Sequence, residues 1–108
     1  MAPKRKISFD KTEIALYDDS GKRPRILNLT YERITSIQMD HSTMRYLGVL
    51  KKPSDRIAIQ VRSLENPVCL YSAKEGELFN EYVEGLRTFC KENRITLHDY
   101  LAHPEQQK

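Results

Sequence analysis

The sequence predicts a mostly β protein of the α+β class, in which a bent antiparallel barrel of about seven strands is capped by one C-terminal helix. Apolar residues alternate with polar ones, with period 2, through most of the first 72 residues. Near Ser72 the period changes to 3.6 and stays so for about twenty residues. The length of 108 residues suits one core, so we expect a single domain over residues 1–108, with the barrel at 5–72, the helix at 75–92 and a tail at 94–108.

The composition is that of an ordinary globular protein. Hydrophobic residues make up 39% of the chain and charged residues 31%, which excludes collagen, a disulfide scaffold and a long disordered polyampholyte. No apolar run approaches the roughly 20 residues that a membrane span needs, so we expect no transmembrane segment. The two cysteines, Cys69 and Cys90, occur without a secretory signal, so we expect reduced thiols and a cytoplasmic protein.

Three short strands are expected in the first thirty residues or so. Ile7 and Phe9 alternate with polar neighbours, and the same pattern recurs around Ile14 and around Leu27. Turn chemistry separates the strands, since Asp and Ser bond their own backbone and Gly supplies a positive φ. The expected strands are 6–9, 13–17 and 25–29, with turns at 10–11 and 18–21.

Four further strands are expected before Ser72. The run 56–62 has the cleanest alternation, with Ile57, Ile59 and Val61 on one face. Tyr31 to Arg33 breaks the alternation and predicts a single helical turn. The four expected strands are 35–40, 45–50, 56–62 and 67–72, and the expected turns are 51–55 and 65–67.

One amphipathic helix follows the strands. Its apolar stripe consists of Leu78, Phe79, Tyr82, Val83, Leu86, Phe89 and Cys90. Ser72 and Glu75 have the spacing of a capping box, and Asn93 is a typical helix stop. Beyond it we expect one short helix started by Thr96 and a frayed end after His103.

The passage from Ile26 to Ile37 resembles a pleckstrin-homology-like (PH-like) domain of the small bacterial PH-like and GRAM-like type. It matches the family's pattern of a leucine, a short turn, an isoleucine and a second isoleucine or valine between the third and fourth strands. The strands 56–62 and 67–72 and the helix 75–92 follow in the family's order, so the resemblance covers residues 5–93.

The resemblance implies a bent barrel of two near-orthogonal sheets capped by the C-terminal helix. It also implies a scaffold that binds phosphoinositides, peptides or other proteins, and it carries no catalytic residues. The phosphoinositide-binding members have a basic motif across their first two strands, where this chain has the short turn Asp10-Lys11.

The placement of charge predicts a candidate anion site. Residues 1–25 hold seven Lys and Arg against four Asp and Glu, whereas the remaining 83 residues hold eleven of each. If the first three strands form a meander, the starts of the first and third lie at one end, about 10 Å apart. The six cations brought together are Lys4, Arg5, Lys6, Lys22, Arg23 and Arg25. They would bind an anionic group through charge-assisted hydrogen bonds, or else form a solvated basic edge.

The function predicted from the sequence is a non-catalytic binding module that engages a protein partner or an anionic group, such as a lipid headgroup. No nucleophile elbow, metal-ligand spacing or phosphate loop occurs, so we expect no enzyme activity, no metal and no cofactor. The alternative is a small enzyme or ligand carrier that uses the interior or open end of the barrel. The modest charge and the absence of Trp argue against nucleic acid. Apolar tail residues such as Ile95 and Leu97, together with open strand edges, leave a homo-oligomer open.

Overall fold

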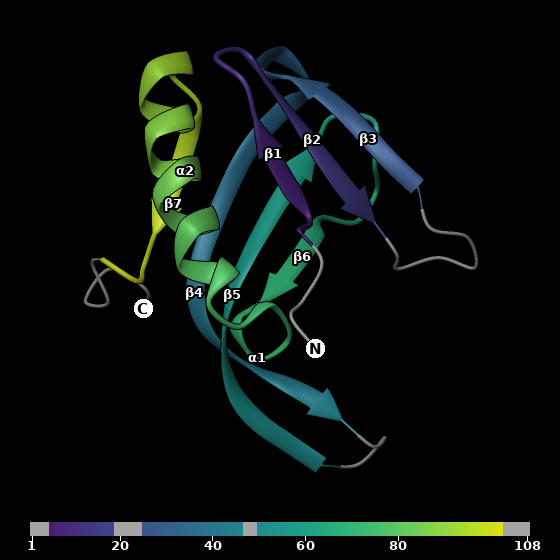
Figure 1. The fold of residues 1–108 in the computed structure, drawn as a ribbon, viewed down its shortest axis with the longest axis vertical. Coiled ribbons are helices and arrows are strands. Elements are labelled where there is room, and N and C mark those ends of the chain that lie inside the picture. The colour runs from purple at the N-terminus through teal and green to yellow at the C-terminus, as the bar shows by residue number, and fades with distance from the viewer. Residues whose placement is uncertain (1–4, 19–24, 47–49, 103–108) are drawn as a thin grey trace.

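The strands of the protein form two separate sheets with one main helix beside them (Figure 1). The computed structural model describes residues 5–18, 25–46 and 50–102. The three-stranded sheet has the order β1 (Ile7–Phe9), β2 (Glu13–Asp18), β3 (Arg25–Thr30). The four-stranded sheet has the order β6 (Val68–Tyr71), β5 (Leu50–Val61), β4 (Ile34–Tyr46), β7 (Thr96–Asp99). The predicted mostly β class with one C-terminal helix is therefore confirmed.

The three-stranded sheet is the antiparallel meander that the sequence predicts. Ile7 lies opposite Leu16, and Leu16 lies opposite Leu27, so the apolar positions of the three strands share one face. Ile7 and Leu16 are almost fully buried, because this face packs on the core. The tight turn at Asp10 is closed by its N–H, which donates to the Glu13 carbonyl at 2.8 Å. A short 3-10 turn, η1 (Tyr31–Arg33), then leads into β4, as the break in alternation indicates.

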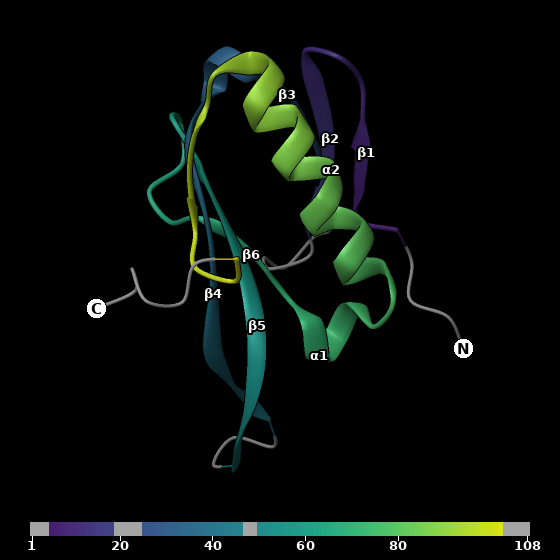
Figure 2. The ribbon, with the colours of Figure 1, turned by 90° about the vertical axis from the view of Figure 1, so that its left-hand side faces the viewer.

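The main helix, α2 (Leu78–Asn93), closes one side of the core. Its predicted apolar stripe is confirmed, since six of its members are buried: Phe79, Tyr82, Val83, Leu86, Phe89 and Cys90. Figure 2 shows α2 lying between β1 of one sheet and β7 of the other. The helix ends at Asn93 as predicted, and Arg94 takes the left-handed conformation (φ 57°) that closes many helices.

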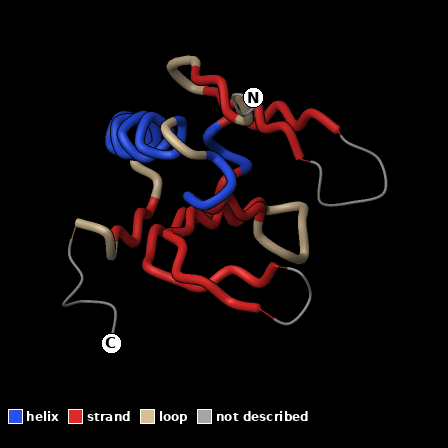
Figure 3. Tube along the Cα trace, turned by 60° about the horizontal axis from the view of Figure 1, so that its bottom comes forward, coloured by secondary structure: helices blue, strands red, loops and turns tan. Residues whose placement is uncertain are grey.

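The helix begins differently from the prediction. A four-residue helix, α1 (Ser72–Glu75), precedes α2, and Gly76 separates the two with a φ of 59°. The capping box is wrong, because Ser72 is the first helical residue and its hydroxyl accepts the N–H of Asp55 at 2.9 Å. Figure 3 shows the two sheets as separate layers with the helical segments between them.

The predicted turn at 51–55 is also wrong, because these residues belong to β5. The β4–β5 pair runs without interruption from Ser36 opposite Gln60 to Tyr46 opposite Leu50. The expected strand 45–50 is therefore the end of β4 and the start of β5, and Gly48 lies outside the described residues. Pro53 is tolerated here because it lies in β5 beyond the residues that pair with β6, so its missing N–H costs no bond to that strand.

The tail forms a strand in place of the predicted short helix. Residues 96–99 are β7, which pairs in parallel with β4 from Ser36 to Met39, so the four-stranded sheet is mixed rather than antiparallel. Asp99 anchors it, because the Arg87 guanidinium of α2 donates to both carboxylate oxygens at 2.6 and 3.3 Å. Ile95, Leu97 and Leu101 pack against the core, so the tail covers its own domain.

Candidate functional site

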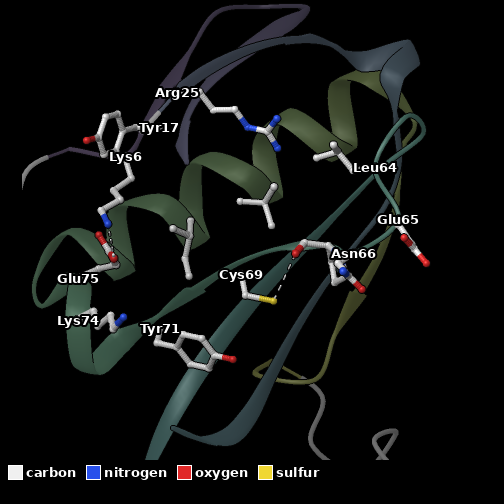
Figure 4. Close-up of a pocket in the computed structure, with 13 residues that line it drawn as sticks. Lys6, Tyr17, Arg25, Leu64, Glu65, Asn66, Cys69, Tyr71, Lys74 and Glu75 are labelled. Carbon is white, nitrogen blue, oxygen red and sulfur yellow. Dashed lines mark hydrogen bonds and ion pairs between the residues drawn. The ribbon is translucent and has the colours of Figure 1, made fainter. Parts of the chain in front are cut away.

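A pocket of about 690 Å³ lies between the end of the three-stranded sheet where β1 and β3 begin and β6 of the other sheet, beside α1 (Figure 4). We call it the groove. Lys6, Tyr17 and Arg25 line it from the three-stranded sheet. The segment from Leu64 to Tyr71 lines it from the other sheet, and Lys74 and Glu75 line it from α1. Its volume is within the range of about 300–1,000 Å³ that is typical of ligand sites.

The groove follows from the strand order. Among the described strands, β3 pairs only with β2 and β6 pairs only with β5, so each sheet has an outer strand on this side. The other two outer strands, β1 and β7, both contact α2. One apolar helix can cover one pair of edges only, and therefore the edges of β3 and β6 flank the groove.

A largely buried ion pair joins the two walls at one end of the groove. The Lys6 ammonium lies 3.9 Å from the Glu75 carboxylate, whose side chain is only 3% exposed. The Lys6 ammonium also lies 5.9 Å from the centre of the Tyr17 ring, in cation–π range. The backbone N–H of Lys6 donates to the hydroxyl of Tyr82 at 2.7 Å, which fixes the start of β1 against α2.

The remaining charges of the groove are mostly positive. Arg25 stands at the start of β3, and Lys74 is exposed on α1, while Glu65 is the acidic residue of the loop before β6. Because the Glu75 carboxylate is buried beside Lys6, the exposed charges of the lining are those of Arg25, Lys74 and Glu65. The groove therefore suits a ligand that carries negative charge.

Cys69 lies in the groove but lacks the character of a nucleophile. Burial raises the pKa of its thiol, and the nearby Arg56 guanidinium opposes that rise only in part. Arg56 is itself bound by the buried Asp40 carboxylate, with contacts of 2.6 and 3.0 Å, and this hydrogen-bonded pair raises the pKa of Arg56. The Cys69 thiol consequently stays protonated at neutral pH.

The structure brings two of the six predicted cations to the groove. The register confirms that β1 and β3 start at the same end of the sheet, and Lys6 and Arg25 both line the groove. Arg5 points elsewhere, since its guanidinium lies 3.3 Å from the Glu81 carboxylate of α2. Lys4, Lys22 and Arg23 lie outside the described residues.

The opposite wall of the groove was not predicted. Tyr71 lies in β6 and Lys74 in α1, and nothing in their spacing in the sequence indicates that they line the groove opposite Lys6 and Arg25. The usable signal was the alternation of β6, which buries Val68 and Leu70 and leaves Cys69 and Tyr71 half-buried on the other face.

These features define a small α+β protein with two sheets, one closing helix and a cationic groove. Comparisons of the chain with models of protein families, with curated proteins and with solved structures find no match. Among residues 5–18, 25–46 and 50–102, no group of three or more His, Cys, Asp or Glu is placed to hold a metal ion. No helix in the same ranges is both long and apolar enough to cross a bilayer.

Proposed function

We propose that the protein is a cytoplasmic, non-catalytic binding module with a PH-like barrel architecture, and that its groove engages an acidic segment of a protein partner. The observation that carries the proposal is the position of Arg25 and Lys74 on opposite walls of a groove between two strand edges. An extended segment can pair with such an edge through its backbone, while cations on either side hold its carboxylates.

The charge and chemistry of the lining support binding rather than catalysis. Lys6 is committed to Glu75, and the thiol of Cys69 is held protonated, so the groove lacks an activated nucleophile among these residues. Tyr17 and Tyr71 add aromatic surface of the kind that is enriched where proteins meet. The alternative of a small enzyme or ligand carrier requires titratable groups that converge on one reacting atom, and no observation on the described residues supports such a convergence.

The test is a titration followed by amide NMR. The probe is an acetylated hexapeptide of alternating Glu and Val, and the control peptide has Lys in place of each Glu. We expect the acidic peptide to shift amides from Glu65 to Tyr71 and around Arg25. The variants Arg25→Gln and Lys74→Gln should each weaken binding by about three- to tenfold, since each removes one charge contact from an exposed position.

The matched control is Lys91→Gln, which removes the same charge from an exposed position on α2. It should leave the affinity unchanged. Equal binding of the Lys peptide, or an unchanged affinity in Arg25→Gln, would contradict the proposal. Shifts with inorganic phosphate that match those with the peptide would reassign the groove to small anions, and dimerisation abolished by Arg25→Gln would reassign it to a second copy of the chain.

A further inference from the structure

The far ends of β4 and β5 form an arm that leaves the body of the protein. Strand β7 pairs with β4 only up to Met39, and β6 pairs with β5 only from Arg56 onward. In the described part of the chain, residues 41–46 and 50–55 therefore pair only with each other. Six residues of strand extend about 20 Å. Figures 1 and 2 show this arm projecting beyond α1.

The base of the arm is held firmly. The Ser54 hydroxyl, which is buried, accepts the N–H of Ala73 at 3.1 Å, and the Asp55 N–H donates to Ser72. His41 Nδ1 lies 2.6 Å from the Asp55 carboxylate across the two strands. An isolated two-stranded ribbon is marginal by itself, so these contacts fix the direction in which the arm points.

The arm is cationic. Between Asp40 and Asp55 the chain has Arg45, Lys51 and Lys52 and no acidic residue. Lys51 and Lys52 are both exposed. Consecutive strand residues point to opposite faces, so each face of the arm carries a cation, and both favour a partner with many negative charges.

The apolar residue Leu50 lies one position farther out along β5 than Lys51. Leu50, the first residue of β5, is 47% exposed and lies opposite Tyr46 in the register. The three residues that join the strands are Leu47, Gly48 and Val49 in sequence, and their placement lies outside the described residues. Among the described residues of β5, the order from the base outward is therefore Lys52, Lys51 and then Leu50. This order suits a bilayer surface, where apolar side chains enter the acyl boundary and cations remain among anionic headgroups.

A nucleic acid fits the same order less well. A two-stranded ribbon can enter the major groove, but its outer end then meets phosphates and base edges, where cations and hydrogen-bond donors are useful. Leu50 at that end offers neither. Addition of another strand to the β5 edge is also disfavoured, because Pro53 and the two lysines are residues that block pairing at exposed edges.

We propose that the β4–β5 arm docks the protein onto anionic lipid bilayers, with Leu50 at the acyl boundary and Lys51 and Lys52 among the headgroups. This proposal is independent of the groove. It predicts binding that requires anionic lipid, weakens with salt and is unaffected by Arg25→Gln.

The first experiment is cosedimentation with vesicles made of equal parts phosphatidylserine and phosphatidylcholine, and with vesicles of phosphatidylcholine alone. We expect binding to the first only. The double variant Lys51→Gln/Lys52→Gln should lower the partition coefficient about 30-fold, because each headgroup contact is lost. The control Lys11→Gln/Lys91→Gln removes the same charge from exposed positions at the other end of the molecule and should change it little.

The second experiment uses the absence of Trp from the sequence. A Leu50→Trp variant places a single indole on the arm, and its emission should shift to the blue on addition of the anionic vesicles. The matched control is Ile26→Trp, since Ile26 on β3 is 66% exposed and lies on the body. Its emission should stay the same.

Three outcomes would overturn the proposal. The first is a lack of binding to anionic vesicles. The second is binding that both double variants weaken equally, which would indicate a general charge effect. The third is retarded migration of a DNA or RNA duplex that depends on Lys51 and Lys52 but not on Leu50, without any blue shift of Leu50→Trp on vesicles. That result would assign the arm to nucleic acid.

Discussion

The hydroxyl of Tyr82 joins α2 to the start of β1, and its removal is the most direct test of this packing. Tyr82 has no exposed surface, and its oxygen accepts the N–H of Lys6 at 2.7 Å. In Tyr82→Phe the ring still fills its space, so no cavity forms. The Lys6 N–H, however, loses its acceptor at a position that is partly buried.

The expected cost is that of one unsatisfied buried donor, about 1–3 kcal/mol. For a domain of this size it corresponds to a fall in melting temperature of about 5–15 °C. The loss is measured by urea and thermal unfolding. Native-state hydrogen exchange then identifies its source, because the Lys6 amide should exchange faster in the variant, while amides of β4 and β5 should change only with the global stability.

Tyr31→Phe is the control, because Tyr31 is an exposed tyrosine on η1. Its unfolding free energy should match that of the wild type. If Tyr82→Phe is as stable as the wild type and the Lys6 amide keeps its protection, then water or another group accepts the hydrogen bond of that N–H. The inference that Tyr82 anchors β1 to α2 would then be wrong.

Two further predictions concern α2. Gly85→Ala should destabilise the protein despite the better helix propensity of Ala, because a Cβ there would lie 2.5 Å from Cε2 of the Phe9 ring. In a Phe9→Ala background the same substitution should become stabilising. Unfolding measurements on both pairs of variants test this expectation. Burial raises the pKa of Cys90 from 9.0 to about 11, so the unfolded thiol ionises first. Stability that is complete below pH 9 should therefore fall by about 2–3 kcal/mol as the pH rises to 11, and Cys90→Ala should lose that part of the slope in urea unfolding at graded pH.

The parts of the fold that sequence could predict are those set by local periodicity. The alternation at Ile7, Ile14 and Leu27 indicates a strand with one buried face, and the stripe from Phe79 to Cys90 indicates a helix with one buried face. In both cases the hydrophobicity of each side chain indicates whether that side chain is buried.

The parts that sequence did not predict depend on distant neighbours. Lys51-Lys52-Pro53 has the local chemistry of a turn, but β4 opposite supplies the pairing that keeps it extended. Residues 96–99 become a strand because β4 offers an edge for parallel pairing, and a sequence pattern carries no sign of such an edge. For the same reason Lys6 and Arg25 could be placed together from a simple meander, whereas Tyr71 and Lys74 could not.

One short segment positions both surfaces proposed here. Tyr71 ends β6 opposite Arg56 and lines the groove, and the next residue, Ser72, binds the N–H of Asp55 at the base of the arm. The groove and the arm therefore start from the same place but use different charges, Arg25 and Lys74 in one and Lys51 and Lys52 in the other. If the arm holds the protein on a bilayer, the hydrogen bond between Ser72 and the base of the arm fixes the orientation of the groove relative to the membrane. Loss of either set of charges should leave the other surface intact, and this separation is what distinguishes two sites on one rigid base from a single diffuse patch of positive charge.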